Sequence, residues 1–142
     1  MLAEKFGKYS DYASVVLRLA LGSILFWHGQ AKFMNFAGTA GFFGGMFPAP
    51  SLFAVIAVLI ELVGGAFLIL GVLTRLSALL VALEFAVILF LRILIWKNPL
   101  VAFQGGNSFE LDLLIFAAAV ALILAGSGKL GLERQVFRKE LI

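Results

Sequence analysis

Three ionisable residues in strongly apolar surroundings, His28, Arg92 and Asp112, have the chemistry to bind and protonate a polar ligand. Arginine is a permanently charged hydrogen-bond donor, a carboxylate is an acceptor, and histidine is the residue type best suited to exchange protons near neutral pH. A polar ligand in an apolar slot needs such a donor, with an acid or base nearby. We treat these three residues as a candidate catalytic site, with an aromatic slot formed by Phe42, Phe43, Phe47 and Trp96.

A second charged set, Arg18, Glu61 and Glu84, also interrupts apolar sequence. An ionised side chain near the middle of a bilayer costs at least about 2.5–3.5 kcal/mol, so such groups must be paired, hydrated or used. We expect Glu61 to meet Arg18, directly or through water, or else to be protonated. The set then serves either as buried ion pairs that fix the helices or as a proton relay. Arg18 could instead extend to the inner interface, and Lys32 to the outer one.

Four apolar runs must position these side chains. A helix needs about 20 residues to cross the hydrocarbon core, and all four runs are long enough. They favour an all-α membrane protein, a four-transmembrane-helix bundle that forms one domain over residues 1–142. The first run is too long for the apolar region of a cleavable signal peptide, so we count it as a span. The expected spans are about 12–32, 51–73, 76–96 and 109–125.

Depth along the helices separates the two charged sets. With a rise of about 1.5 Å per residue and a core about 30 Å thick, Arg18, Glu61 and Glu84 lie about 9–15 Å from the inner face. His28, Arg92 and Asp112 all lie about 24–25 Å from it, so we expect them to converge on a pocket open to the outer side. Alternatively, Arg92 extends outward to the interface and Asp112 merely lies in the first turn of its helix. Glu110 could lie in the same turn and form a capping box with Asn107.

Basic residues outside the spans favour one topology. With the N-terminus inside, seven of them face the cytoplasm and only Lys32 and Lys97 face outward, which predicts two cytoplasmic termini in the inner (cytoplasmic) membrane. Residues 33–50 and 97–108 are then outer connections. The first is expected to be a loop in the headgroup region or a re-entrant flap. The seven inner residues are Lys5, Lys8, Arg75, Lys129, Arg134, Arg138 and Lys139.

Composition excludes several classes of protein. Hydrophobic residues make up 63% of the chain and charged residues 13%, whereas soluble domains have about 45–50% and about 25%. No cysteine is present, which excludes disulfides, thiol chemistry and cysteine-held iron–sulfur clusters from this chain. One histidine cannot make a bis-histidine haem site or the usual structural zinc site. We expect no metal site, and no nucleic-acid partner because the basic residues form no patch.

Three sequence elements resemble the DoxX family of small four-helix membrane proteins, and together they extend over nearly the whole chain. The first comprises residues 17–22 and 27–32, and the last comprises residues 106–113 and 126–128. The most specific is the element Glu61-x-x-Gly64-Gly65 followed by Gly71-x-x-Thr74-Arg75.

The resemblance implies a small or accessory subunit of a quinone-linked membrane oxidoreductase, with quinone as the possible cofactor. Its expected partners are membrane lipid and a membrane protein or a second copy of this chain. The wider superfamily includes cargo receptors and receptor-assembly chaperones, so a non-catalytic scaffold or assembly factor is an alternative. A small proton-coupled carrier, with Glu61 as the relay, is a third. The sequence leaves open whether the chain is itself an enzyme.

Overall fold

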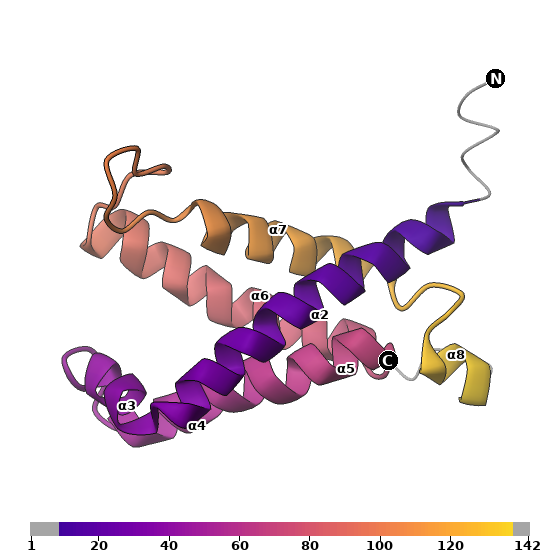
Figure 1. Ribbon diagram of the computed structural model, residues 1–142, viewed down its shortest axis with the longest axis horizontal. Helices are drawn as coiled ribbons and strands as arrows, with labels where there is room; N and C mark the ends of the chain where they lie inside the picture. Colours follow the sequence, from indigo (N-terminus) through magenta and orange to yellow (C-terminus); the bar gives the residue numbers. More distant parts are fainter. Residues whose placement is uncertain (1–8, 138–142) are drawn as a thin grey trace.

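The computed structural model describes residues 9–137, and this part of the chain is helical and contains no strand (Figure 1). The expected all-α class is therefore confirmed for these residues. Four of the basic residues used to predict topology, Lys5, Lys8, Arg138 and Lys139, lie outside the described range. The helices are α2 (Ser10–Met34), α3 (Phe36–Gly44), α4 (Pro50–Val58), the π-helix η1 (Leu59–Val63), α5 (Gly64–Leu70), α6 (Thr74–Phe90), the π-helix η2 (Leu91–Ile95), α7 (Glu110–Ala125) and α8 (Leu132–Phe137).

Three of the described helical segments are long and apolar enough to cross a membrane: Tyr12–Met34, Pro50–Leu70 and Thr74–Ile95. The second joins α4, η1 and α5 end to end, and the third joins α6 and η2. Large apolar side chains on their outer faces, such as Val16 and Leu59, are exposed, as expected for surfaces that contact lipid. The protein is therefore a multi-pass membrane protein. Helix α7 has 16 residues and falls short of this length.

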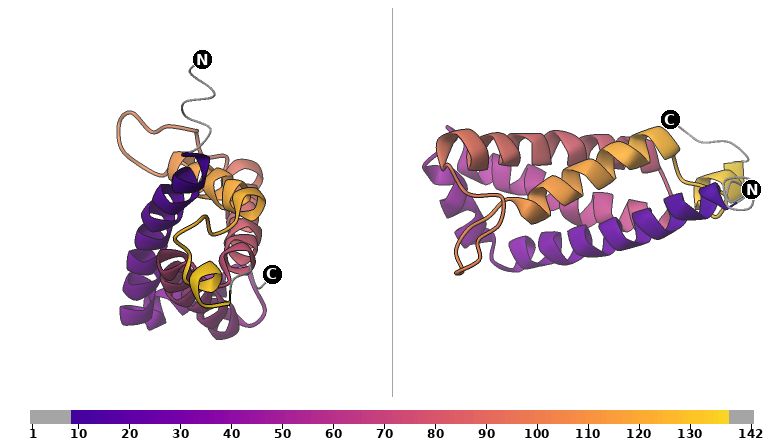
Figure 2. Two further views of the ribbon diagram at one scale, coloured as in Figure 1. Left: turned by 90° about the vertical axis from the view of Figure 1, so that its right-hand side faces the viewer. Right: turned by 90° about the horizontal axis from the view of Figure 1, so that it is seen from above.

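The long helices pack side by side around a shared apolar core (Figure 2). Helix α2 lies against α5 and η1, while α7 lies against α6 and, less extensively, α2. The core is made of aliphatic side chains and one phenylalanine from α2, α5, α6 and α7. Its members are Leu21, Leu25, Leu68, Ala78, Val81, Ala82, Phe85, Ile115, Ala119 and Leu122.

Glycines allow α2 to approach the second apolar segment closely. A Cβ atom on Gly22 would lie 2.7 Å from the carbonyl oxygen of Gly65, and one on Gly29 would lie 2.8 Å from Cα of Leu62. Small residues at such crossings let helix backbones touch, which is a common means of association in membranes. The close approach sets the position of η1 relative to α2.

The connection between α5 and α6 is a tight turn at Gly71–Leu73. Gly71 has φ 68°, the left-handed conformation that glycine adopts without steric cost, and Leu73 has φ 47°. The turn reverses the chain, so α5 and α6 pack antiparallel. Thr74 begins α6.

The expected loop at residues 33–50 is partly wrong, because α3 occupies Phe36–Gly44. The side chain of Asn35 accepts a hydrogen bond from the Gly38 backbone N–H at 3.3 Å and so caps the helix start. The aromatic rings that follow pack together: the rings of Phe43 and Phe47 are 5.8 Å apart, and those of Phe47 and Phe53 stack at 4.2 Å. Capping and ring packing thus give order to a glycine-rich segment.

Arg18 closes the end of the molecule that holds α8. Its guanidinium is buried and donates hydrogen bonds to four backbone carbonyls, those of Leu68 (3.1 Å), Ile69 (2.5 Å), Ser127 (3.2 Å) and Leu130 (3.0 Å). The last carbonyls of a helix lack intrahelical donors and attract cations, and α5 ends at this point. The expected pair of Arg18 with Glu61 is therefore wrong, because the guanidinium binds backbone carbonyls instead.

Two further contacts tie the same end together. The Ser14 hydroxyl donates to the carbonyl of Gly126 at 2.5 Å, which joins α2 to the end of α7. The buried carboxylate of Glu133 in α8 accepts from the Leu73 backbone N–H at 2.9 Å. Polar contacts at this end thus link segments that are far apart in sequence.

Candidate functional site

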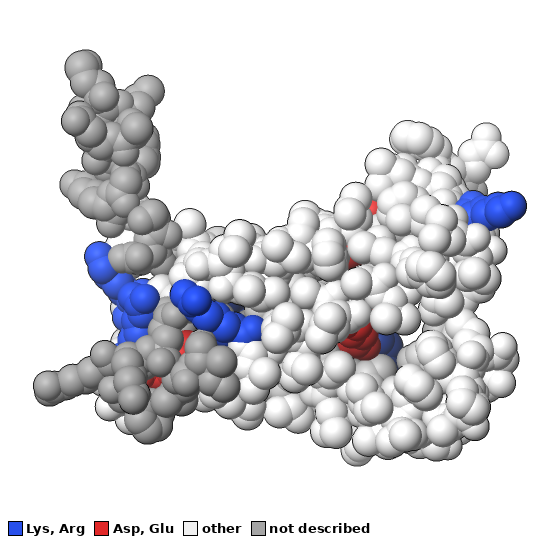
Figure 3. Space-filling view, turned by 180° about the vertical axis from the view of Figure 1, so that it is seen from behind, with Lys and Arg blue, Asp and Glu red and all other residues white. Residues whose placement is uncertain are grey.

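A cavity of about 740 Å³ lies between the helices, and Arg18 is not among the residues that line it. Ligand pockets usually measure about 300–1,000 Å³ and combine apolar walls with a few polar groups, and this cavity fits both criteria. Figure 3 shows acidic side chains beside a basic one in a hollow, with uncharged side chains around it. The ionisable residues of the wall are His28, Lys32, Glu61, Glu84, Arg92, Glu110 and Asp112.

The three predicted catalytic residues all line this one cavity. Arg92 Nε and Asp112 Oδ2 form an ion pair at 2.5 Å, which joins η2 to α7. His28 from α2 is exposed and lies within electrostatic range of Asp112. The structure therefore brings together residues from three helices that the sequence placed only at a common depth, and it pairs Arg92 inside the protein.

A second ionic contact faces the same cavity. Lys32 Nζ lies 2.7 Å from Glu61 Oε1, and only 1% of the Glu61 side chain is exposed. The prediction that Lys32 extends to the outer surface is therefore wrong, and Lys32 takes the place expected for Arg18. In the sequence, only spacing indicated that Lys32 could face the cavity: it lies one helical turn after His28 on α2.

Glu84 on α6 also lines the cavity, next to this ionic contact. It lies within electrostatic range of both Glu61 and Lys32. The Oε2 atoms of Glu61 and Glu84 are buried and have no hydrogen-bond partner in the described structure. Of the predicted relay set, Glu61 and Glu84 thus meet at the cavity, whereas Arg18 does not.

Two charged residues of the cavity wall, Glu61 and Arg92, lie in π-helical turns. Glu61 is in the middle of η1 and Arg92 is the second residue of η2. A π-turn inserts an extra residue into a helix and changes the direction of the side chains around it, and such turns are frequent at functional sites. No sequence pattern that we used predicts them, and helical spacing alone misplaces the side chains that follow.

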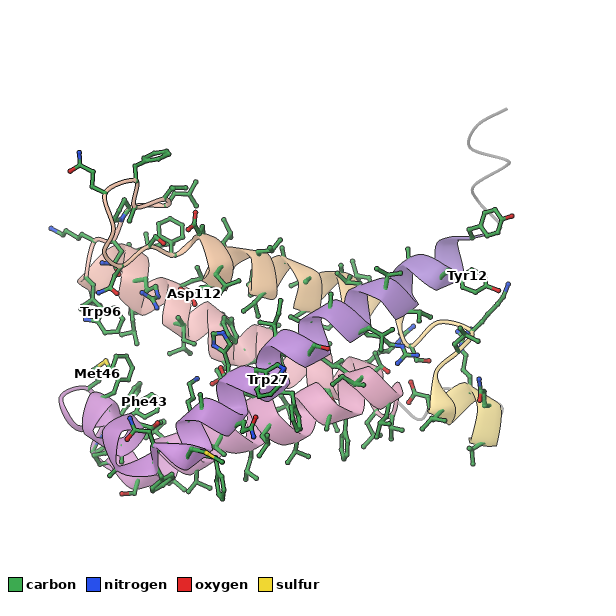
Figure 4. All side chains as sticks on the ribbon, viewed as in Figure 1. Tyr12, Trp27, Phe43, Met46, Trp96 and Asp112 are labelled. Carbon is green, nitrogen blue, oxygen red and sulfur yellow. The ribbon has the colours of Figure 1, made fainter. Side chains whose placement is uncertain are left out.

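Aromatic side chains from three segments form one wall of the cavity. The predicted slot residues Phe43, Phe47 and Trp96 line it, and Phe42 contacts the Trp96 ring edge-on with the ring centres 5.8 Å apart. Phe53 completes the wall and was missed, although it lies in the second apolar run. Figure 4 shows Phe43 and Trp96 at the end of the molecule that holds α3, with Asp112 further along the helices.

The expected capping box at Glu110 is wrong. Helix α7 begins at Glu110 with Phe109 as N-cap and no capping side chain, and Glu110 Oε1 instead accepts from the Ser108 hydroxyl at 3.4 Å. Glu110 is exposed at the cavity wall. Within residues 9–137, no group of three His, Asp or Glu side chains is arranged to hold a metal ion. The cavity can bind a ligand through hydrogen bonds, ionic contacts and aromatic stacking.

Comparison with known proteins identifies the family. The DoxX family model matches residues 13–93. A Bacillus subtilis (strain 168) protein named "Putative oxidoreductase CatD" is 34% identical over 132 residues, which cover 92% of each chain. An uncharacterized protein of Haemophilus influenzae is 32% identical over 132 residues, or 93% of this chain and 96% of its own. None of the solved structures matches the chain. The family match over more than half of the residues, together with relatives that cover nearly the whole chain, shows that this protein belongs to the DoxX family.

Proposed function

We propose that this protein is a small subunit of a quinone-linked membrane oxidoreductase and that its cavity holds the quinone head group. The observation that carries the proposal is the cavity itself, because it combines an aromatic wall with paired charges inside a lipid-facing protein. The relative named as an oxidoreductase supports the same class of activity. A bound quinone would supply the capacity to carry electrons and protons.

The residues near Asp112 suit a quinone carbonyl. Asp112 holds Arg92 through Nε, which leaves the terminal N–H groups of the guanidinium to donate elsewhere. His28, exposed at the cavity, offers a second donor or a proton. Phe43, Phe47 and Trp96 provide flat apolar surfaces for a ring, so binding combines polar orientation with aromatic packing.

Electron transfer to or from the cavity requires a second redox protein, because this chain contains no cysteine and has a single histidine. We therefore propose that a membrane protein partner with its own redox cofactor exchanges electrons with the quinone. The exposed apolar helix faces offer surfaces for this partner, or for a second copy of the chain, within the bilayer.

We place α7 across the membrane as a fourth span, with both termini in the cytoplasm. The run 109–125 has 17 residues, at the lower end of the range of about 17–25 that can span. Basic side chains gather at the end that holds α8, and fewer are visible at the opposite end (Figure 3). This asymmetry supports a cytoplasmic α8 and an inner-membrane location.

Cysteine labelling tests this topology. The chain has no native cysteine, so Gly44→Cys and Asn107→Cys each introduce a single thiol. Both should react with a membrane-impermeant maleimide added to intact cells, whereas Lys129→Cys should react only after the membrane is permeabilised. The reverse labelling pattern would contradict the proposed orientation.

Quinone retention tests the proposed function. The full chain, extracted in mild detergent, should retain quinone that mass spectrometry identifies, and it should bind duroquinone in solution. Arg92→Gln should weaken duroquinone binding about tenfold or more, because a hydrogen bond from a charged donor contributes about 1.5–3 kcal/mol. Glu110→Gln, at an exposed carboxylate of the same wall, is the matched control. Recovery of a partner protein without any quinone binding would favour the scaffold alternative.

A further inference from the structure

The hydrogen-bonding groups around the cavity are unequally satisfied. Each of its two permanent cations is engaged by a carboxylate, Lys32 by Glu61 and Arg92 by Asp112. The buried polar atoms of the wall without partners in the described structure are carboxylate oxygens, Glu61 Oε2 and Glu84 Oε2, apart from the ion-paired Nε of Arg92. Of these, Glu61 Oε2 belongs to a carboxylate that is paired with Lys32, so it offers an acceptor position to a ligand.

Glu84 and Glu61 do not satisfy each other. They lie close enough to interact electrostatically, yet neither Oε2 atom reaches a hydrogen-bond partner. Lys32 contacts only Oε1 of Glu61 at 2.7 Å. A buried acceptor left without a donor is unfavourable, so a ligand that donates at this point gains stability that a ligand without a donor cannot gain.

The polar residues near Asp112 and those near Lys32 require opposite hydrogen-bonding roles from a ligand. Arg92 and His28 are donors on the wall near Asp112, whereas Glu61, which is paired with Lys32, is an acceptor in the other polar group. A ligand that spans both groups must accept at one end and donate at the other. A hydroxyl oxygen can do both, whereas a carbonyl oxygen can only accept.

We infer that the cavity preferentially binds the reduced quinol form of its ligand, with one hydroxyl donated to Oε2 of the Glu61 carboxylate. This inference rests on the proposed function and specifies the redox state that the site selects. Quinone and quinol have the same ring and nearly the same shape, so the aromatic wall does not distinguish them. The difference arises from the hydroxyl hydrogens, one of which meets the unpartnered acceptor.

Three related compounds test the inference with the full chain in detergent: durohydroquinone under anaerobic conditions, duroquinone, and the dimethyl ether of durohydroquinone. Equilibrium dialysis gives a dissociation constant for each. Durohydroquinone should bind at least about tenfold more tightly than duroquinone, a difference that corresponds to about 1.4 kcal/mol. The dimethyl ether shares the reduced ring but has no donor, so it should bind no more tightly than duroquinone.

Two variants test which residue causes the preference for quinol over quinone. Glu61→Gln replaces the acceptor carboxylate by an amide that also donates, and it should reduce the quinol preference by several-fold. Lys97→Gln changes an exposed residue that does not line the cavity, so as the control it should leave the preference unchanged. Equal binding of duroquinone and durohydroquinone to the unmodified chain would overturn the inference while leaving the quinone site intact. Failure of all three compounds to bind would overturn both proposals.

Discussion

Replacing Arg18 by glutamine is expected to lower the free energy of unfolding by at least about 3 kcal/mol. The guanidinium donates to four carbonyls on α5 and on the segment between α7 and α8. A glutamine amide can reach at most one or two of them, and each lost hydrogen bond from a charged donor costs about 1.5–3 kcal/mol. The change therefore releases α2 from α5 and from the segment before α8. Unfolding in a denaturing detergent titration measures the loss.

Two companion variants define the cause of this loss. Arg18→Lys keeps the positive charge but replaces the planar fork by a single ammonium, so its stability should fall between those of the unmodified chain and Arg18→Gln. Lys97→Gln removes an exposed charge at the opposite end and should change stability by less than about 0.5 kcal/mol. An Arg18→Gln variant as stable as the unmodified chain would show that the carbonyl contacts contribute nothing.

Replacing Gly29 by alanine is the second large effect that we expect, a destabilisation of about 2 kcal/mol or more. The new Cβ would meet backbone atoms of Leu62 and Glu61, which cannot move aside as a flexible side chain can. Overpacking of this kind usually costs about 1–3 kcal/mol. The shift of η1 also moves Glu61 away from Lys32, so binding in the cavity should weaken together with stability.

Gly64→Ala is the matched control for this substitution. Gly64 is also helical, but a Cβ there would meet no atom within 4 Å. Alanine has the better helix propensity, so this variant should be unchanged or more stable by up to about 1 kcal/mol. Detergent unfolding of both variants and ligand binding to both separate the two effects. Similar behaviour of the two alanine variants would contradict the role assigned to the close helix approach.

Much of the architecture can be predicted from the sequence because a segment that crosses lipid must be apolar and long enough to span the hydrocarbon core. The expected spans 12–32, 51–73 and 76–96 coincide within a few residues with helical segments long enough to cross. The run 109–125 coincides with α7. The residues of the candidate site could also be chosen, because any ionisable group in an apolar run is costly and therefore noticeable. Their depth along the helices correctly indicated that His28, Arg92 and Asp112 share one cavity.

The choice of partner for each charge depended on the tertiary structure. Hydropathy and helical rise give the height of a side chain but not the direction in which it points. That direction depends on the π-turns around Glu61 and Arg92 and on the close approach at Gly29. These features brought Lys32 rather than Arg18 to Glu61. Arg18 instead donates to the carbonyls of Leu68 and Ile69 at the end of α5. The sequence could not reveal this role, because every residue has a backbone carbonyl and the pattern of side chains does not mark the ones that bind a cation.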